Sequence, residues 1–204
     1  MLNPRRGHVG LTLIELMVVI ALLAFLLMLG APSFSTWIQN SRLRSSAESI
    51  LAGLQQAKAE AVSRNARVRF QFTSTLDDTC ALSTSSANWV VNLDPDSDPN
   101  AVVGSCGTAP DDAAAPRILH KRDGVNTPTG LVVATGGVSS VVFNGLGRIT
   151  PVPAGNVSIT LSNPTIGDCA DAGGPVTCLR IVVSPAGQLR MCNPKFSLPD
   201  PQGC

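Results

Sequence analysis

The longest hydrophobic feature of the chain lies near its N-terminus. No polar side chain occurs in residues 16–30, and within residues 11–31 only Thr12 and Glu15 interrupt the apolar sequence. About 20 helical residues, at a rise of about 1.5 Å each, cross the roughly 30 Å hydrocarbon core of a bilayer. Residues 11–31 are therefore expected to form a transmembrane helix. The apolar run continues into a helical pattern without a secretory cleavage site, so we expect the segment to be retained.

The charges around this segment predict its orientation. Arg5 and Arg6 lie just before it, and the positive-inside rule then places the N-terminus in the cytoplasm and the rest of the chain across the inner membrane. Glu15 is unusual in such a segment, because a carboxylate inside a bilayer is costly and is usually paired and functional. We therefore expect Glu15 to have a cationic partner.

A different hydrophobic pattern follows the apolar segment. Apolar residues recur at spacings of three and four up to about Arg64, which is typical of a helix with one apolar face. The residues of this pattern are Phe34, Trp37, Ile38, Ala47, Ile50, Leu51, Leu54, Ala57 and Ala61. We expect residues 32–65 to form an amphipathic helix that continues into a globular head, with Phe34 and Trp37 against lipid headgroups or sister subunits.

The period changes again after Arg67. Apolar and polar residues alternate over 68–72, which is typical of a half-buried strand. Further apolar segments bounded by Gly, Pro, Asn and Asp predict strands at 89–93, 117–121, 131–134, 138–144, 156–162, 178–184 and 187–192. Residues 66–204 are therefore expected to form a β-rich head. The predicted fold class is α+β, a long N-terminal helix packed on a head of antiparallel sheets.

The charge composition argues against a broad basic surface for nucleic acid but allows a small basic patch. The 204 residues are 14% charged with a net charge of +1, which argues against a broadly basic nucleic-acid binder. However, residues 77–112 contain seven acids and no Lys or Arg, whereas residues 117–204 contain seven basic residues and four acids. Basic residues on or beside the last predicted strands could hold phosphates, or be ordinary solvated charges: Arg148, Arg180, Arg190 and Lys195.

The cysteines predict disulfides. All six follow the apolar segment: Cys80, Cys106, Cys169, Cys178, Cys192 and Cys204. An even number of cysteines in an oxidising compartment is typical of disulfide bonding, although six cysteines allow fifteen pairings. Their spacing favours the local pairs Cys80–Cys106, Cys169–Cys178 and Cys192–Cys204.

The sequence contains no motif of a hydrolase nucleophile, a phosphate-binding loop or a zinc protease, so we expect no enzyme and no cofactor. His120 is interpreted as a surface or edge histidine of a strand. Asp94, Asp96 and Asp98 resemble the start of a calcium loop, but the Gly and Glu that such a loop requires at its sixth and twelfth positions are missing. We expect a solvated acidic turn there and no metal site.

Residues 10–15, Gly-Leu-Thr-Leu-Ile-Glu, resemble the cleavage and assembly motif of type IV prepilins. The resemblance implies that residues 1–10 are a basic leader, that a prepilin peptidase cuts after Gly10, and that the new amine of Leu11 is methylated. Members of the family more often have Phe or Met at this position. Cleavage would create an ammonium at Leu11 that Glu15 of this or a neighbouring subunit could neutralise.

Three later stretches, residues 57–65, 88–94 and 143–148, are similar to the GspH/FimT group of minor pilins and pseudopilins. This resemblance implies a minor type IV pilin that assembles or primes a pilus, first in the inner membrane with its head in the periplasm and then in the extracellular filament. Other pilins would contact its N-terminal helix. The alternative is a type II secretion pseudopilin, whose filament uses the same kind of N-terminus.

Residues 181–190 are similar to the stretch in which some FimT-like pilins carry Gly-Arg-x-Arg, a motif associated with DNA binding in natural transformation. Gly187 and Arg190 match this motif, but Gln188 replaces its first arginine. The replacement removes a charge and a bidentate phosphate contact. DNA capture through Arg190, Arg148 and their neighbours is therefore a second hypothesis beside the structural one.

Overall fold

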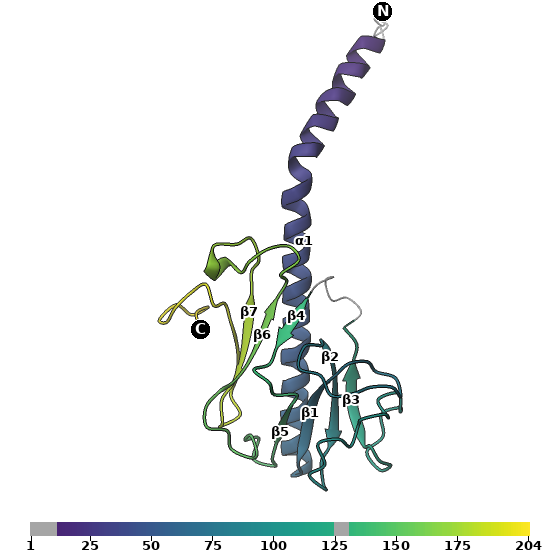
Figure 1. Cartoon of the computed structure of the whole chain (residues 1–204), viewed down its shortest axis with the longest axis vertical. Coiled ribbons are helices and arrows are strands. Elements are labelled where there is room, and N and C mark those ends of the chain that lie inside the picture. Colours follow the sequence, from purple (N-terminus) through teal and green to yellow (C-terminus); the bar gives the residue numbers. More distant parts are fainter. Residues whose placement is uncertain (1–11, 125–130) are drawn as a thin grey trace, which may run out of the picture. The chain divides into compact units, whose positions relative to one another are not determined.

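The computed structural model describes residues 12–124 and 131–204, with the side chains of residues 29–33 outside the description. The chain divides into two compact units, residues 1–38 and residues 39–204. Helix α1, Leu13–Arg64, contributes to both. The second unit, here called the head unit, also contains all the strands that follow α1 along the chain (Figure 1).

In the first unit, α1 is apolar on every side. All its large apolar side chains between residues 13 and 28 are exposed. A helix that is hydrophobic all round has no single face that one packing partner could cover. Among the described residues, none of the helices meets the length and hydrophobicity needed to cross a membrane.

In the head unit, α1 has a single buried stripe. Its fully buried members are spaced by three or four residues: Leu43, Ala47, Ile50, Leu54, Ala57 and Ala61. The helix ends at Arg64, as the pattern predicts. Asn65 adopts a positive φ of 47° and the amide of Ala66 donates to the carbonyl of Ala61, an arrangement typical of helix C-termini.

The described strands of the head unit form two antiparallel sheets of four strands each, in the orders β3-β2-β1-β5 and β4-β6-β7-β8. Their bounds are β1 Val68–Thr73, β2 Asn88–Leu93, β3 Ile118–Arg122, β4 Val132–Ala134, β5 Ser140–Phe143, β6 Val157–Ser162, β7 Leu179–Val183 and β8 Leu189–Cys192. A short 3-10 helix, Ala170–Ala172, lies between β6 and β7. Each strand overlaps a segment that the sequence predicts, and the α+β fold class is confirmed.

One hydrophobic core joins α1 to both sheets. It contains the stripe of α1 and inward side chains of strands from both sheets, among them Phe70 and Trp89 of the first sheet and Ile181 of the second. Gly53 allows the close approach, because a Cβ at this position would lie 2.8 Å from the Phe70 ring and 2.9 Å from Trp89. The head unit is therefore built around this half of α1.

The expectation that β1 is half-buried is wrong, because all six of its residues are buried. Gln71 faces away from α1, where its amide nitrogen donates to Asn92 at 2.9 Å. Val90 is the cross-strand partner of Gln71 and belongs to a second, smaller hydrophobic cluster. Ile118 of β3 and the segments between β1 and β3 supply the rest of this cluster, which covers the outer face of the sheet.

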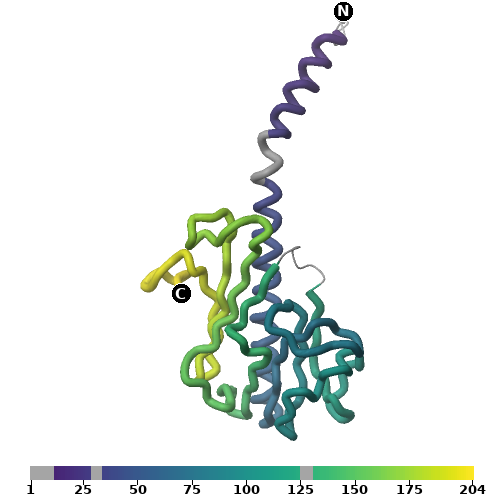
Figure 2. Tube along the Cα trace, in the orientation of Figure 1, coloured from purple at the N-terminus to yellow at the C-terminus, as the bar shows by residue number. Residues whose placement is uncertain are grey.

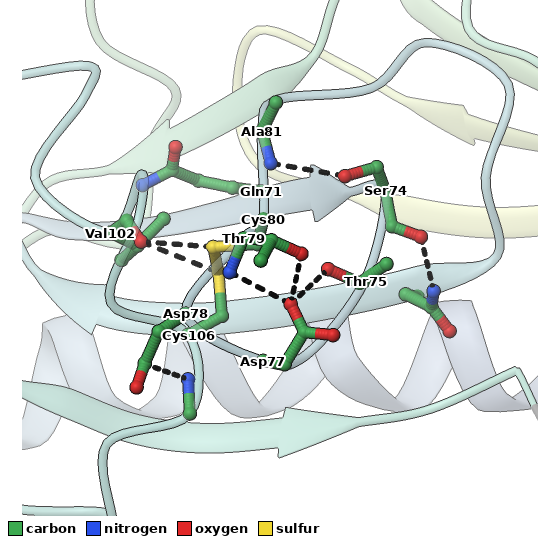
Figure 3. Close-up of a disulfide and its surroundings, with 12 residues drawn as sticks. Gln71, Ser74, Thr75, Asp77, Asp78, Thr79, Cys80, Ala81, Val102 and Cys106 are labelled. Atoms are coloured by element: carbon green, nitrogen blue, oxygen red, sulfur yellow. Dashed lines mark hydrogen bonds between the residues drawn. A yellow bond between two sulfur atoms is a disulfide. The ribbon is translucent and has the colours of Figure 1, made fainter.

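Three disulfides join Cys80–Cys106, Cys169–Cys178 and Cys192–Cys204. These are the local pairs that the spacing favours. The first lies in the smaller cluster, where both sulfurs approach the carbonyl of Val102 (Figure 3). The third fastens the C-terminal segment, yellow in Figure 2, to the end of β8. The loops that connect the strands are therefore fixed covalently as well as by packing.

Candidate functional site

The start of α1 carries the first group of candidate residues. Gly10 and Leu11, the expected processing site, lie outside the described residues. Glu15 lies in the first turn of the helix, where its backbone amide donates to the Thr12 hydroxyl at 3.3 Å. Its side chain is exposed. An acid near a helix N-terminus is favourable, and an exposed carboxylate is accessible to a cationic group from outside the described chain.

Two of the four candidate phosphate-binding residues lie together on one sheet face. Arg180 of β7 pairs in register with Cys192, and Val182 pairs with Arg190 of β8. The two arginines are therefore diagonal neighbours on the face turned away from the core. In the usual strand geometry the Cα atoms of such neighbours lie about 7–8 Å apart. Arg180 also donates through Nε to the Thr160 hydroxyl at 3.3 Å, which holds its side chain along the sheet.

Arg148 lies beside the turn that leads into β8. The amide of Ile149 donates to the carbonyl of Pro185 at 3.2 Å, which joins the two turns. Gly187 has a φ of 79°, and a Cβ there would overlap the carbonyl of Gly147. Glycine is therefore required at 187 by packing, whatever binds nearby.

Lys58 was not a candidate from the sequence, yet its ammonium donates to the carbonyl of Gly187 at 2.9 Å. It connects α1 to the same turn. Nothing in the helical pattern around Lys58 indicates this contact, because the partner lies 129 residues away along the chain.

Lys195 is separated from the sheet face. It lies in the C-terminal segment, with its backbone amide bound to the Asn193 side chain and its ammonium 6.0 Å from the Phe196 ring centre. Within residues 12–124 and 131–204, no carboxylate lies within 4.0 Å of the four candidate cations. The fold therefore groups Arg180 and Arg190, adds Arg148 at the neighbouring turn, and leaves Lys195 in the terminal loop.

The acidic region has a different environment, because arginines neutralise several of its acids. Asp94 accepts from Arg69 at 2.8 Å and from Arg67 at 3.1 Å. Asp94 is 2% exposed, so the expected solvated acidic turn is wrong for this residue. Burial is tolerated because both guanidinium groups are bound to its carboxylate. Asp96 lies 3.8 Å from Arg117 and is exposed.

His120 lies on the edge strand β3, as its interpretation requires, but it has a specific partner. Its Nε2 lies 3.1 Å from Glu60, whose other carboxylate oxygen accepts from Arg64 at 2.7 Å. Arg64 also contacts Asp112 at 2.7 Å. The hydrogen bond from Arg64, followed by that from His120, holds the pKa of Glu60 below its ordinary value. Arg64 likewise lowers the pKa of Asp112.

These features define the class of protein, an α+β chain with a long N-terminal helix. The first part of this helix is apolar and exposed, and the second part packs against the two sheets of the head unit. The family described as Type II transport protein GspH matches residues 46–187. The chain belongs to this family. The match covers the buried stripe of α1 from Ala47 onward and both sheets as far as the Gly187 turn, and it includes neither the segment around Glu15 nor Arg190.

Two crystal structures of the type IV minor pilin FimU of Pseudomonas aeruginosa are similar to the chain at 17% identity. The structure in space group P65 has a TM-score of 0.46 and the match covers 72% of this chain and 90% of that one. The structure in space group P21 has a TM-score of 0.49, with 76% and 91% covered. No curated protein matches the sequence significantly.

Proposed function

We propose that the chain is a filament subunit, a FimT-like minor type IV pilin that takes part in pilus assembly or priming. The observation that carries this proposal is the contrast along α1: its apolar side chains are exposed on all sides over residues 13–28, and form one buried stripe in the head unit. An all-round apolar helix needs lipid or other apolar helices around it. A filament subunit meets both needs: lipid surrounds the helix while the subunit is in the membrane, and the apolar helices of other subunits surround it in the filament.

Membrane anchoring is the first part of the proposal. Residues 11–31 would hold the chain in the inner membrane as a single span, with the head unit in the periplasm. The support is the uninterrupted apolar sequence of residues 16–30 and the preceding Arg5 and Arg6. The three disulfides suit an oxidising compartment such as the periplasm.

Processing and docking are the second part. A prepilin peptidase would cleave after Gly10, and the methylated amine of Leu11 would then lie near the exposed carboxylate of Glu15 on the same or a neighbouring subunit. In a low-dielectric bundle of apolar helices, this opposite charge is the interaction that fixes the register between subunits.

Sheared filaments provide the test. Wild-type chain and the E48Q variant should be present in filaments sheared from the cell surface at equal levels, because Glu48 is an exposed acid that pairs only with Arg44 among the described residues. The E15Q variant should remain in the membrane fraction and fall at least roughly tenfold in filaments. Wild-type levels of E15Q in sheared filaments would contradict the proposed docking role.

A type II secretion pseudopilin is the alternative, and the description of the matched family favours it. Deletion of the gene separates the two. Loss of surface pili with normal export of secreted enzymes supports the pilus assignment, whereas normal pili with the enzymes retained in the periplasm supports the secretion assignment.

DNA capture is a second candidate function, favoured by the pair of Arg180 and Arg190 on the sheet face turned away from the core. The full chain in detergent should then bind duplex DNA in a salt-sensitive manner. Replacing Arg190 by alanine should weaken binding about five- to tenfold and lower the salt slope by about one, because one phosphate contact is lost. The control is R42A, which removes an exposed arginine of α1. Absent binding, or equal binding by R190A, contradicts this function.

A further inference from the structure

An exposed aromatic pair lies on the first unit of the chain. The rings of Phe34 and Trp37 stack with centroids 5.9 Å apart and an interplanar angle of 25°. They are 62% and 65% exposed, and among the described residues no group accepts a hydrogen bond from the Trp37 indole. The other tryptophan, Trp89, is 3% exposed and donates to the Ser49 hydroxyl. The chain thus has one tryptophan in its core and one that its own described residues leave uncovered.

The pair lies at a sharp change of polarity. The apolar residues 16–30 precede it. Three residues beyond Trp37 the chain is polar and already fixed in the head unit, since the Asn40 side chain donates to the carbonyl of Pro175 at 3.1 Å and accepts from the amide of Thr177 at 2.9 Å. An indole has an apolar body and one polar N–H group, and such rings favour the boundary between hydrocarbon and water.

The length of the intervening chain matches a bilayer. Trp37 follows Glu15 by 22 positions, which corresponds to about 33 Å at the helical rise. The hydrocarbon core of a bilayer is about 30 Å thick. When Trp37 lies at one interface, Glu15 therefore reaches the opposite one, where its carboxylate can stay hydrated. This depth displaces the span toward the head by a few residues from the 11–31 expected from hydropathy. A shift of the helix by one turn toward the periplasm would draw the carboxylate into the hydrocarbon.

We propose that the Phe34–Trp37 pair is an interfacial anchor, which contacts the lipid headgroup region on the periplasmic side and sets the depth of the helix before assembly. This inference rests on the proposed membrane anchoring and adds the residues that determine the depth. Lipid is favoured over a sister subunit because the distance along the helix from Glu15 to Trp37 matches the distance between the two surfaces of the hydrocarbon core.

Depth-dependent fluorescence quenching tests the anchor. The full chain is reconstituted into phosphatidylcholine–phosphatidylglycerol vesicles whose acyl chains carry bromine either near the headgroup or near the methyl end. The wild-type emission should be quenched at least about twofold more strongly by the shallow bromines than by the deep ones. The W37F variant keeps Trp89 as its only tryptophan and should lose this bromine-dependent quenching. The F34L variant keeps both tryptophans and should shift quenching toward the deep probe or toward aqueous iodide.

Several results would overturn the assignment. Equal quenching of wild-type chain and W37F, stronger quenching by the deep bromines, or strong quenching by iodide alone would each remove Trp37 from the interface. Emission that is protected from both quenchers at high protein-to-lipid ratio would assign the pair to a contact between chains. A chain that does not float with the vesicles contradicts the membrane anchoring itself, whereas a floating chain without Trp37-dependent quenching contradicts only the anchor.

Discussion

Residues 13–28 and residues 39–64 belong to the same helix, but their apolar side chains have different surroundings. In the first stretch, large apolar residues on every side are exposed. In the second stretch, one stripe is fully buried under the two sheets, and polar residues such as Arg44 and Glu48 occupy the other side. The distribution of apolar positions around the helix, more than their number, indicates whether the chain's own head or something outside it covers them.

The two stretches also contribute differently to stability. Burial under the sheets stabilises the head unit directly, because this apolar surface leaves water when the head folds. The first stretch adds nothing of this kind until lipid or other subunits surround it. Substitutions in the two stretches should therefore affect different measurements, and the following predictions test this separation in order of decreasing effect.

Removing a buried leucine of the stripe should have the largest effect. Leu54 is fully buried in the core, and Leu54→Ala should lower the free energy of unfolding by about 3–4 kcal/mol through lost burial and a residual cavity. Leu23→Ala, in the exposed stretch, should leave it unchanged within about 0.5 kcal/mol. Urea unfolding of the full chain in detergent, followed by Trp89 emission in a W37F background, provides the measurement. Equal destabilisation by both variants would contradict the claim that the two stretches of α1 contribute differently to the stability of the head unit.

The buried ion pair of the head unit should come next. The side chain of Arg69 is 8% exposed and that of Arg67 is 35% exposed, although both bind Asp94. Arg69→Met should cost about 3 kcal/mol, because it removes a buried partner of a buried carboxylate. Arg67→Met should cost less than about 1 kcal/mol. The same unfolding assay ranks them, and the reverse order would show that Arg67 is the main partner of Asp94.

Acidification should have the smallest effect on stability, through Glu60 near the C-terminal end of α1. The pKa of Glu60 is lowered in the folded state, so its contribution is fully present above about pH 4.5 and is lost as the pH falls through the lowered folded-state value. Thermal unfolding between pH 6 and pH 3 should show E60Q destabilised at the upper end, with the difference from wild type shrinking toward the lower end. The matched control is E48Q, and a pH-independent difference for E60Q would contradict the assignment.

Local pattern predicted much of this fold. The end of α1 near Arg64 and all eight strand segments follow from periodicity and turn residues, because these report how each segment meets its own surroundings. The burial of β1 has no signal in the strand itself, since the cluster on its outer face includes residues from distant loops, such as Val102 and Cys106. The Arg69–Asp94 and His120–Glu60 contacts, 25 and 60 residues apart, carry no local signal either.

The candidate site was predictable to a lesser degree. Arg180 and Arg190 were both candidates, but only the register of β7 and β8 places them on one face. The sequence also distinguishes an acidic stretch, residues 77–112, from a mildly basic one, residues 117–204. In the fold, Arg64, Arg67, Arg69 and Arg117 neutralise part of this acidic stretch. The more distinctive feature is the positive charge of the sheet face, which has no carboxylate partner among the described residues.

The mass of the chain extracted from membranes of cells that contain an active prepilin peptidase tests the central claim most directly. The account predicts that residues 1–10 are absent, that Leu11 is the first residue and carries a methyl group, and that replacing Gly10 by valine leaves the chain at full length. A full-length wild-type chain in such cells, or the same shortening in the Gly10 variant, would contradict the proposal that this protein is a processed filament subunit.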